Sequence, residues 1–187
     1  MMSRAECLKV YGSDYLIDKK IEKGELYKIT KGIYSEKKYI PDLAVFSYKY
    51  PNAVITMKSA FYFYNLTDVI PDVCDLATSR DAAKIRDKKV KQYFVSDVFF
   101  KEGIETVDYK GFDIHIYSKE RMLIELVRYK SKLSFDYYKE VILNYRKILP
   151  QLNIQEIQDI ALMAPKSNKI METLQLEVFW WLTLKKC

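Results

Sequence analysis

The sequence predicts an α+β protein, in which a shortened N-terminal winged helix-turn-helix precedes a small β-sheet packed on a C-terminal helical bundle. Capped helical patterns and a glycine-bounded hairpin occupy residues 3–35, alternating apolar residues mark strands up to residue 117, and helical periodicity follows from residue 118. We expect a winged-helix-like domain at 1–50 and an α+β domain at 51–187. In the second domain, the sheet should cover about 53–117 and the helices about 118–185.

Two short helices are expected before residue 24. Ser3 is suited to cap the first, because its hydroxyl can accept an amide hydrogen bond while Glu6 reaches back to the cap. Gly12 is expected to end that helix, and Ser13 or Asp14 to begin a second helix over 13–23. The predicted buried stripe of the second helix consists of Leu16, Ile17 and Ile21.

A hairpin is expected directly after the second helix. Gly24 can take the left-handed backbone that stops the helix, and Lys31-Gly32 forms a tight turn that carries a charge. A helix followed by a hairpin can present a reading helix and a wing to DNA, although many small α/β domains contain the same pair. Under the DNA-binding interpretation, the contacting residues are Ser13, Tyr15, Lys19, Lys20, Lys23, Lys28, Thr30 and Lys31.

The next segment is predicted to hold a short helix over 43–49 and an aromatic-rich helix over 58–67. Residues 61–64 of this second helix are all aromatic, and four consecutive side chains cannot all lie on one face. We therefore expect a core wedge and an interdomain contact in preference to a base-stacking platform, because stacking surfaces usually lie on open sheets.

Four strands are predicted over 73–78, 92–96, 105–109 and 112–117. The last two should form a hairpin closed at Lys110 and Gly111. Between the first two strands lie six basic and two acidic residues in twelve positions. Such a segment is usually a solvated loop or the solvated face of a helix, yet it is also the densest candidate in this chain for binding a polyanion. Its basic residues are Arg80, Lys84, Arg86, Lys88, Lys89 and Lys91.

The remaining chain is predicted to be helical, with apolar residues at helical spacing in 122–127, 137–145, 154–161 and 170–181. Pro150 and Pro165 should separate helices, and Asn153 can cap one of them. Trp180 and Trp181 are expected to pack in the core, because large aromatic side chains at helical spacing usually do so.

The charge distribution and the cysteine positions indicate which partners and cellular compartment to expect. The net charge is +6, and basic residues are in excess within 1–40, 79–101 and 117–150, which favours a polyanionic partner, although lysines also promote solubility. Three cysteines lie far apart, which predicts neither a disulfide framework nor a zinc site. A charged N-terminus and the absence of a long apolar stretch predict a cytoplasmic protein that does not span a membrane.

Catalytic chemistry has little support in the sequence. His115 is the only histidine, and the five scattered glycines form no phosphate-binding loop. A metal-dependent nuclease using Asp75, Asp97 or Asp113 stays open as a weaker alternative, because carboxylates on adjacent strands can bind magnesium. We expect a protein that is not an enzyme and that holds no metal or cofactor.

Four segments in register resemble landmarks of a known family. These segments are Gly24–Tyr34, Pro51–Ile55 leading to Ser59-Ala60, Asp75-Leu76-Ala77, and Ser118–Leu126. In order and spacing they are similar to the AbiEi antitoxins of bacterial abortive-infection systems, which act in phage defence as part of type IV toxin–antitoxin pairs. The resemblance covers most of residues 3–130 and, more loosely, the helices that follow.

The resemblance implies a winged helix that represses its own operon and a C-terminal domain that opposes a nucleotidyltransferase-like toxin without requiring a direct complex. Family members usually have another helix before the position of Ser3, for which this chain has no residues. The family motif maps onto Ser118, Glu120 and Arg121. We interpret these residues as a helix start in which Ser118 caps, Glu120 favours the positive helix end, and Arg121 clamps the sheet to the bundle. The alternative function is an interaction module that does not bind DNA.

Overall fold

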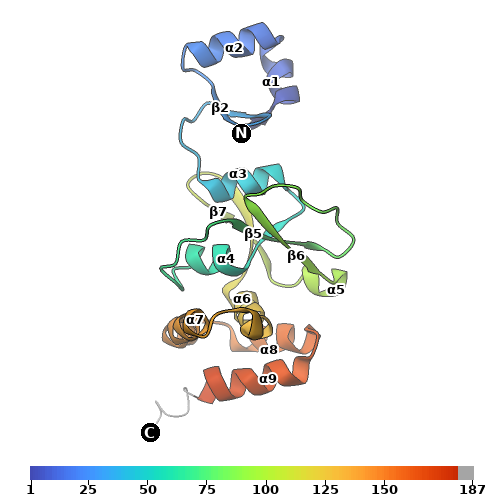
Figure 1. The fold of residues 1–187 in the computed structure, drawn as a ribbon, viewed down its shortest axis with the longest axis vertical. Helices are drawn as coiled ribbons and strands as arrows, with labels where there is room; N and C mark the ends of the chain where they lie inside the picture. The colour runs from blue at the N-terminus through green and yellow to red at the C-terminus, as the bar shows by residue number, and fades with distance from the viewer. Residues whose placement is uncertain (181–187) are drawn as a thin grey trace. The chain divides into compact units, whose positions relative to one another are not determined.

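The computed structural model describes residues 1–180 and has mixed α and β structure (Figure 1). The chain folds into two compact units. Unit 1 comprises Met1–Pro51 together with Asp108–Ile114, and unit 2 comprises Asn52–Val107 and the chain from His115 onward. The predicted domain boundary after residue 50 lies beside the observed one after Pro51, whereas no sequence pattern indicated that a later segment belongs to unit 1.

Unit 1 contains three helices and a three-stranded antiparallel sheet in the order β1-β3-β2. Its elements are β1 (Met2–Ser3), α1 (Arg4–Tyr11), α2 (Asp14–Glu22), β2 (Tyr27–Thr30), β3 (Ile33–Ser35) and α3 (Asp42–Lys49). The two helices, the hairpin and the short helix that follows it agree with the sequence-based prediction. Strand β1 was not predicted, because two residues are too few to show an alternating pattern.

The predicted helix caps of unit 1 are confirmed. Ser3 Oγ accepts the Glu6 backbone N–H at 3.2 Å, and the Glu6 carboxylate accepts the Ser3 N–H at 2.6 Å. Hydrogen bonds that the Glu6 carboxylate accepts from the Ser3 backbone and side chain, with a further one from the Tyr48 hydroxyl, lower the pKa of Glu6 to about 2. Gly12 ends α1 with φ +89°, and Ser13 Oγ accepts the Leu16 N–H at the start of α2.

The core of unit 1 is small. Cys7, Ile17, Leu26 and Tyr34 are buried, and partly buried apolar side chains, Ile21 among them, pack around them. The prediction that Leu16 is buried is wrong, because its side chain is 44% exposed. Successive helical side chains point about 100° apart, so the inner face of α2 holds Ile17 and, one turn later, Ile21.

Unit 2 is built on a five-stranded mixed sheet in the order β6-β5-β4-β8-β7. The strands are β4 (Val54–Ile55), β5 (Cys74–Ser79), β6 (Val90–Val95), β7 (Ile104–Asp108) and β8 (Asp113–Tyr117), with α4 (Met57–Phe63) and α5 (Asp97–Phe100) between them. The outer residues of the β7–β8 hairpin belong to unit 1. Lys110 and Gly111 close this hairpin with φ +56° and +81°, which is the geometry that a two-residue turn favours.

The aromatic helix α4 ends at Phe63, earlier than predicted, and only part of its aromatic run is buried. Phe61 is fully buried and lies edge-on to Tyr137 and Tyr145, with ring centroids 6.4 Å apart in both pairs. Tyr62 is 40% exposed. The run therefore supplies one core wedge, as expected for side chains that point in all directions around a helix.

The C-terminal helices gather on one side of the sheet of unit 2 (Figure 1). They are α6 (Lys119–Arg128), α7 (Phe135–Ile148), α8 (Ile154–Met163) and α9 (Ser167–Leu174), followed by a π-helical turn at Gln175–Phe179. Helix α6 packs against α4, α8 and α9 and so occupies the centre of this unit. The predicted Asn153 cap is confirmed, because its Oδ1 accepts the Glu156 N–H at 3.2 Å. Within residues 1–180, no helix has both the length and the apolar character to cross a membrane.

The prediction that Trp180 packs in the core is wrong. Trp180 is 61% exposed and so does not lie in the core, because it follows the π-helical turn, where the spacing of side chains changes. Trp181 lies outside the described residues.

Asp75 links the start of β5 to the start of α4. Its carboxylate accepts the Lys58 backbone N–H at 2.9 Å, whereas the N-cap residue of this helix, Thr56, makes no capping side-chain bond. Ser59 Oγ in turn accepts the Asp75 N–H at 2.9 Å. Burial raises the pKa of the Asp75 carboxyl, although the hydrogen bond from Lys58 and the charge of Lys91 act in the opposite direction.

The raised pKa of Asp75 predicts that ionising this carboxyl costs stability. Between the ordinary pKa of 3.8 and the higher folded value, the folded state holds a proton that the unfolded state has released, so stability falls as pH rises through this window. Asp75→Asn keeps an acceptor but cannot ionise. In urea titrations, we expect the unfolding free energy of the wild type relative to Asp75→Asn to fall as the pH rises above the ordinary pKa of 3.8. A difference that does not change with pH would contradict this.

Candidate functional site

The predicted DNA-contacting residues lie on α2 and on the β2–β3 hairpin of unit 1. On α2, Tyr15, Lys19 and Lys23 are exposed, and Tyr15 is 71% exposed. Lys19 Nζ lies 6.0 Å from the centroid of the Tyr15 ring, one helical turn away. The buried residue Ile17 fixes the opposite face of α2 in the core, so this aromatic and basic face is presented to solvent.

Two other predicted residues, Ser13 and Lys20, have local roles on α2 and beside it. Ser13 Oγ is used as the cap of α2. Lys20 forms an ion pair with Glu25, which reduces its share of the positive charge of this surface. Lys19 and Lys23 are the more exposed cations of this helix, whereas Lys20 is half-buried.

The hairpin adds two exposed lysines and a tight turn. Lys28 on β2 and Lys31 at the tip are exposed, and Thr30 is half-buried. Gly32 has φ +78°, and no atom lies within 4 Å of the position that a Cβ would take. Lysine side chains are among the groups that commonly contact phosphates, and this hairpin presents two of them.

The basic segment at 80–91 belongs to unit 2 and is largely a loop between the parallel strands β5 and β6. All six of its cationic side chains are exposed. Gln92 fixes the loop, because its amide nitrogen donates to Thr78 Oγ1 (2.8 Å) and to the Ala83 carbonyl (3.1 Å), while its oxygen accepts the Ile85 N–H (2.8 Å). The segment is therefore a cationic loop with a defined backbone anchor.

Ser118, Glu120 and Arg121 lie at the start of helix α6, and each has a hydrogen-bonding partner. Ser118 Oγ accepts the Arg121 N–H at 3.1 Å and caps the helix. Glu120 Oε1 accepts the Asn153 N–H at 3.0 Å, which connects α6 to the start of α8. Arg121 is completely buried. These contacts are structural, and none of them requires a ligand.

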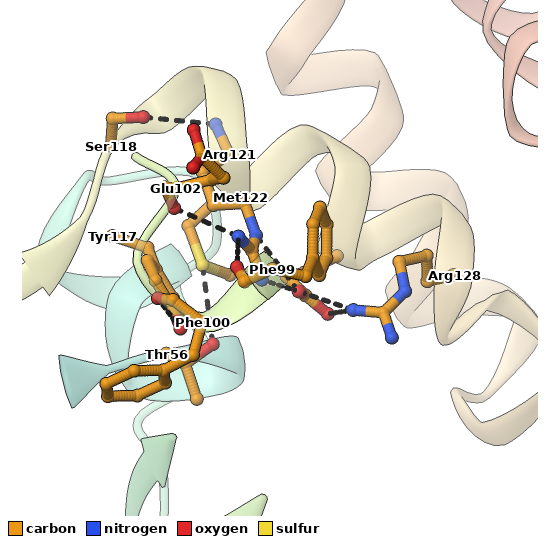
Figure 2. Close-up of polar contacts among 10 residues, drawn as sticks. Thr56, Phe99, Phe100, Glu102, Tyr117, Ser118, Arg121, Met122 and Arg128 are labelled. Carbon is orange, nitrogen blue, oxygen red and sulfur yellow. Dashed lines mark hydrogen bonds and ion pairs between the residues drawn. The ribbon is translucent and has the colours of Figure 1, made fainter. Parts of the chain in front are cut away.

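The Arg121 guanidinium is surrounded by acceptors and aromatic rings (Figure 2). Nη1 donates to the carbonyl oxygens of Phe99 (2.5 Å) and Glu102 (2.9 Å), while Nε and Nη2 donate to Glu125 Oε1 at 3.0 and 2.7 Å. The guanidinium carbon lies 3.5 Å from the Phe99 ring centroid and 4.4 Å from that of Tyr117. Arg121 therefore joins the segment after β6 to helix α6.

Arg128 completes this cluster at its outer end (Figure 2). Its Nη1 donates to both carboxylate oxygens of Glu125, at 2.6 and 2.8 Å, and its side chain is 19% exposed. The sequence analysis did not single out Glu125 or Arg128. Their spacing is a signal that could have found them. Glu125 follows Arg121 by four residues and Arg128 follows Glu125 by three, and side chains at these spacings are neighbours on a helix.

The carboxylates of the nuclease alternative do not form a cluster. Asp75 is buried and bonded to α4, whereas Asp97 and Asp113 are exposed. Among the described residues, no group of three histidine, cysteine or acidic side chains is arranged to hold a metal ion. His115 is half-buried and its Nδ1 lies 3.2 Å from Thr106 Oγ1.

No protein-family model matches this chain, and a search of curated proteins finds no significant match.

Gly103 offers a test of the packing around Arg121. It has φ +68°, and an added Cβ would lie 2.6 Å from Arg121 Cβ and 3.0 Å from Ser118 Oγ. Gly32 has a similar φ but open space around it. In chemical denaturation, we expect Gly32→Ala to cost about 1–2 kcal/mol of unfolding free energy through its backbone alone, and Gly103→Ala at least about 3 kcal/mol. Equal costs at the two positions would contradict this packing.

Proposed function

We propose that this protein is a DNA-binding antitoxin that represses its own operon. The observation that carries the DNA-binding part is the exposed basic and aromatic face of α2 beside a hairpin with a lysine and a glycine at its tip. A strand, two helices and a hairpin that pairs with that strand follow one another in this order in winged helix-turn-helix domains, and they do so in unit 1.

The dimensions and charge of this surface suit a DNA duplex. The major groove is about 12 Å wide and admits one α-helix. In the proposed complex, Tyr15, Lys19 and Lys23 meet the groove or its backbone, while Thr30 and Lys31 meet the adjacent phosphates. Lysines in such positions neutralise phosphates and release counterions, which gives affinity that depends steeply on salt.

The antitoxin part of the proposal rests on the four landmark segments that resemble the AbiEi family. In this proposal, unit 2 opposes a nucleotidyltransferase-like toxin, and the exposed segment 80–91 contributes either further DNA contacts or contacts with the target of the toxin. Repression and toxin opposition would then belong to different units of the chain.

Removing two charges tests the DNA-binding surface. For a duplex covering the region upstream of its own gene, we expect Lys19→Ala/Lys31→Ala to weaken binding at least about tenfold and to lower the slope of log K against log salt by about 2, because each lysine neutralises about one phosphate. Fluorescence anisotropy at several salt concentrations measures both. The matched control is Lys101→Ala/Lys147→Ala, which removes the same charge from exposed positions in unit 2.

An equal loss in the control would show that net charge, and not this surface, supplies the affinity. If the wild type shows no specific binding even at low salt, the DNA-binding proposal falls and the interaction-module alternative replaces it.

Co-expression tests the antitoxin function. We expect the wild type to restore growth of cells that express the nucleotidyltransferase-like toxin encoded beside it, and Lys19→Ala/Lys31→Ala to restore growth equally, because unit 2 is unchanged. Colony counts and growth curves measure this. If the wild type does not restore growth, the antitoxin proposal falls, whatever the DNA-binding result.

A further inference from the structure

A second cationic surface lies in unit 2, around a pocket of about 640 Å³ at the end of α6. The turn after α6, the first turns of α7, and α9 with the residues before it supply the walls. The lining includes the cations Arg128, Lys130, Lys132, Lys166 and Lys169, and among the residues that the structure describes it includes no carboxylate. Like charges repel one another around a shared cavity, and a bound anion relieves that repulsion.

Most of these cations are available to a ligand. Lys130 forms an ion pair with Glu177, but within residues 1–180 Lys132, Lys166 and Lys169 form none. All three of these lysines are exposed. These three charges are therefore exposed to solvent and are not engaged in ion pairs with the described residues.

Arg128 is the most rigidly held of the five cations. Its Nη1 is bonded to Glu125, and Glu125 is held in turn by the buried Arg121. Among the described residues, Nε and Nη2 of Arg128 have no hydrogen-bond partner. The Arg128 side chain is 19% exposed, and a planar guanidinium that is held at one nitrogen and has further N–H donors without partners is suited to bind phosphate oxygens.

The pocket also presents aromatic surface. Phe135 is 73% exposed, and the rings of Tyr129 and Tyr138 take part in the lining. An exposed phenylalanine beside several cations offers a stacking face for a planar ring next to a phosphate-binding group. The volume lies in the range of pockets that hold small ligands.

We propose that this pocket binds a nucleoside polyphosphate. The phosphates contact Arg128, Lys166 and Lys169, and the base stacks against Phe135. This binding site lies in unit 2 and is separate from the proposed DNA-binding surface of unit 1, so that either proposal can fail without the other.

Calorimetric titration of the full chain with ATP tests the proposal. Without added divalent cations, so that the phosphates keep their full charge, we expect a Kd below about 100 µM. Adenosine, which lacks the phosphates, and tripolyphosphate, which lacks the base, should each bind at least about fivefold more weakly, because each makes only part of the contacts.

Two variants assign the contacts. Lys166→Asn/Lys169→Ala should weaken ATP binding at least about tenfold, and asparagine tolerates the left-handed backbone that Lys166 adopts (φ +63°). Phe135→Ala should bring ATP to the affinity of tripolyphosphate. Lys101→Ala/Lys147→Ala removes the same number of charges at other exposed positions and should leave the affinity for ATP unchanged.

The proposal is overturned if ATP binds no more tightly than adenosine, or if the control pair weakens binding as much as the pocket pair. It is also overturned if a short single-stranded oligonucleotide binds through Lys166 and Lys169 while ATP does not, since the ligand is then a nucleic-acid strand. Thermal melts of each variant distinguish lost binding from lost folding.

Discussion

The fold of unit 2 depends on the buried guanidinium of Arg121. A charge inside a protein is tolerated only when it is paired and hydrogen-bonded, and removal of one partner of such a pair costs about 3–5 kcal/mol. Arg121 meets this requirement with the Glu125 carboxylate, two backbone carbonyls and two aromatic rings. In the chain, Phe99 and Glu102 precede strands β7 and β8, whereas Glu125 follows them. One side chain therefore connects the segment around the end of α5 to helix α6.

The same cluster connects the interior of unit 2 to its surface. Glu125 is shared between the fully buried Arg121 and Arg128, which lines the cationic pocket. A shared carboxylate holds Arg128 in one orientation, and this reduces the entropy that would be lost when a ligand binds. A structural requirement of the core therefore also positions a surface cation.

Unit 1 relies on local hydrogen bonds and has no comparable buried ion pair among its described residues. Its apolar core is small, and local hydrogen bonds at the ends of its helices define much of its shape: the Ser3 and Glu6 capping box, the Gly12 stop and the Ser13 cap. Such bonds are formed by residues close in sequence. They leave one whole face of α2 free of core contacts, which is the face that carries the proposed DNA-binding residues.

The sequence by itself determined the α+β class, the helix caps and the hairpin turns, because each depends on residues within a few positions of one another. It also indicated that Ser118 caps a helix and that 80–91 is a basic segment between two strands. Only the tertiary structure decided that β1 pairs with β3, that Leu16 and Trp180 are exposed, and that Glu125 joins Arg121 to Arg128. The cationic pocket likewise combines α6, α7 and α9, since packing between distant segments, and not local pattern, decides which side chains share a surface.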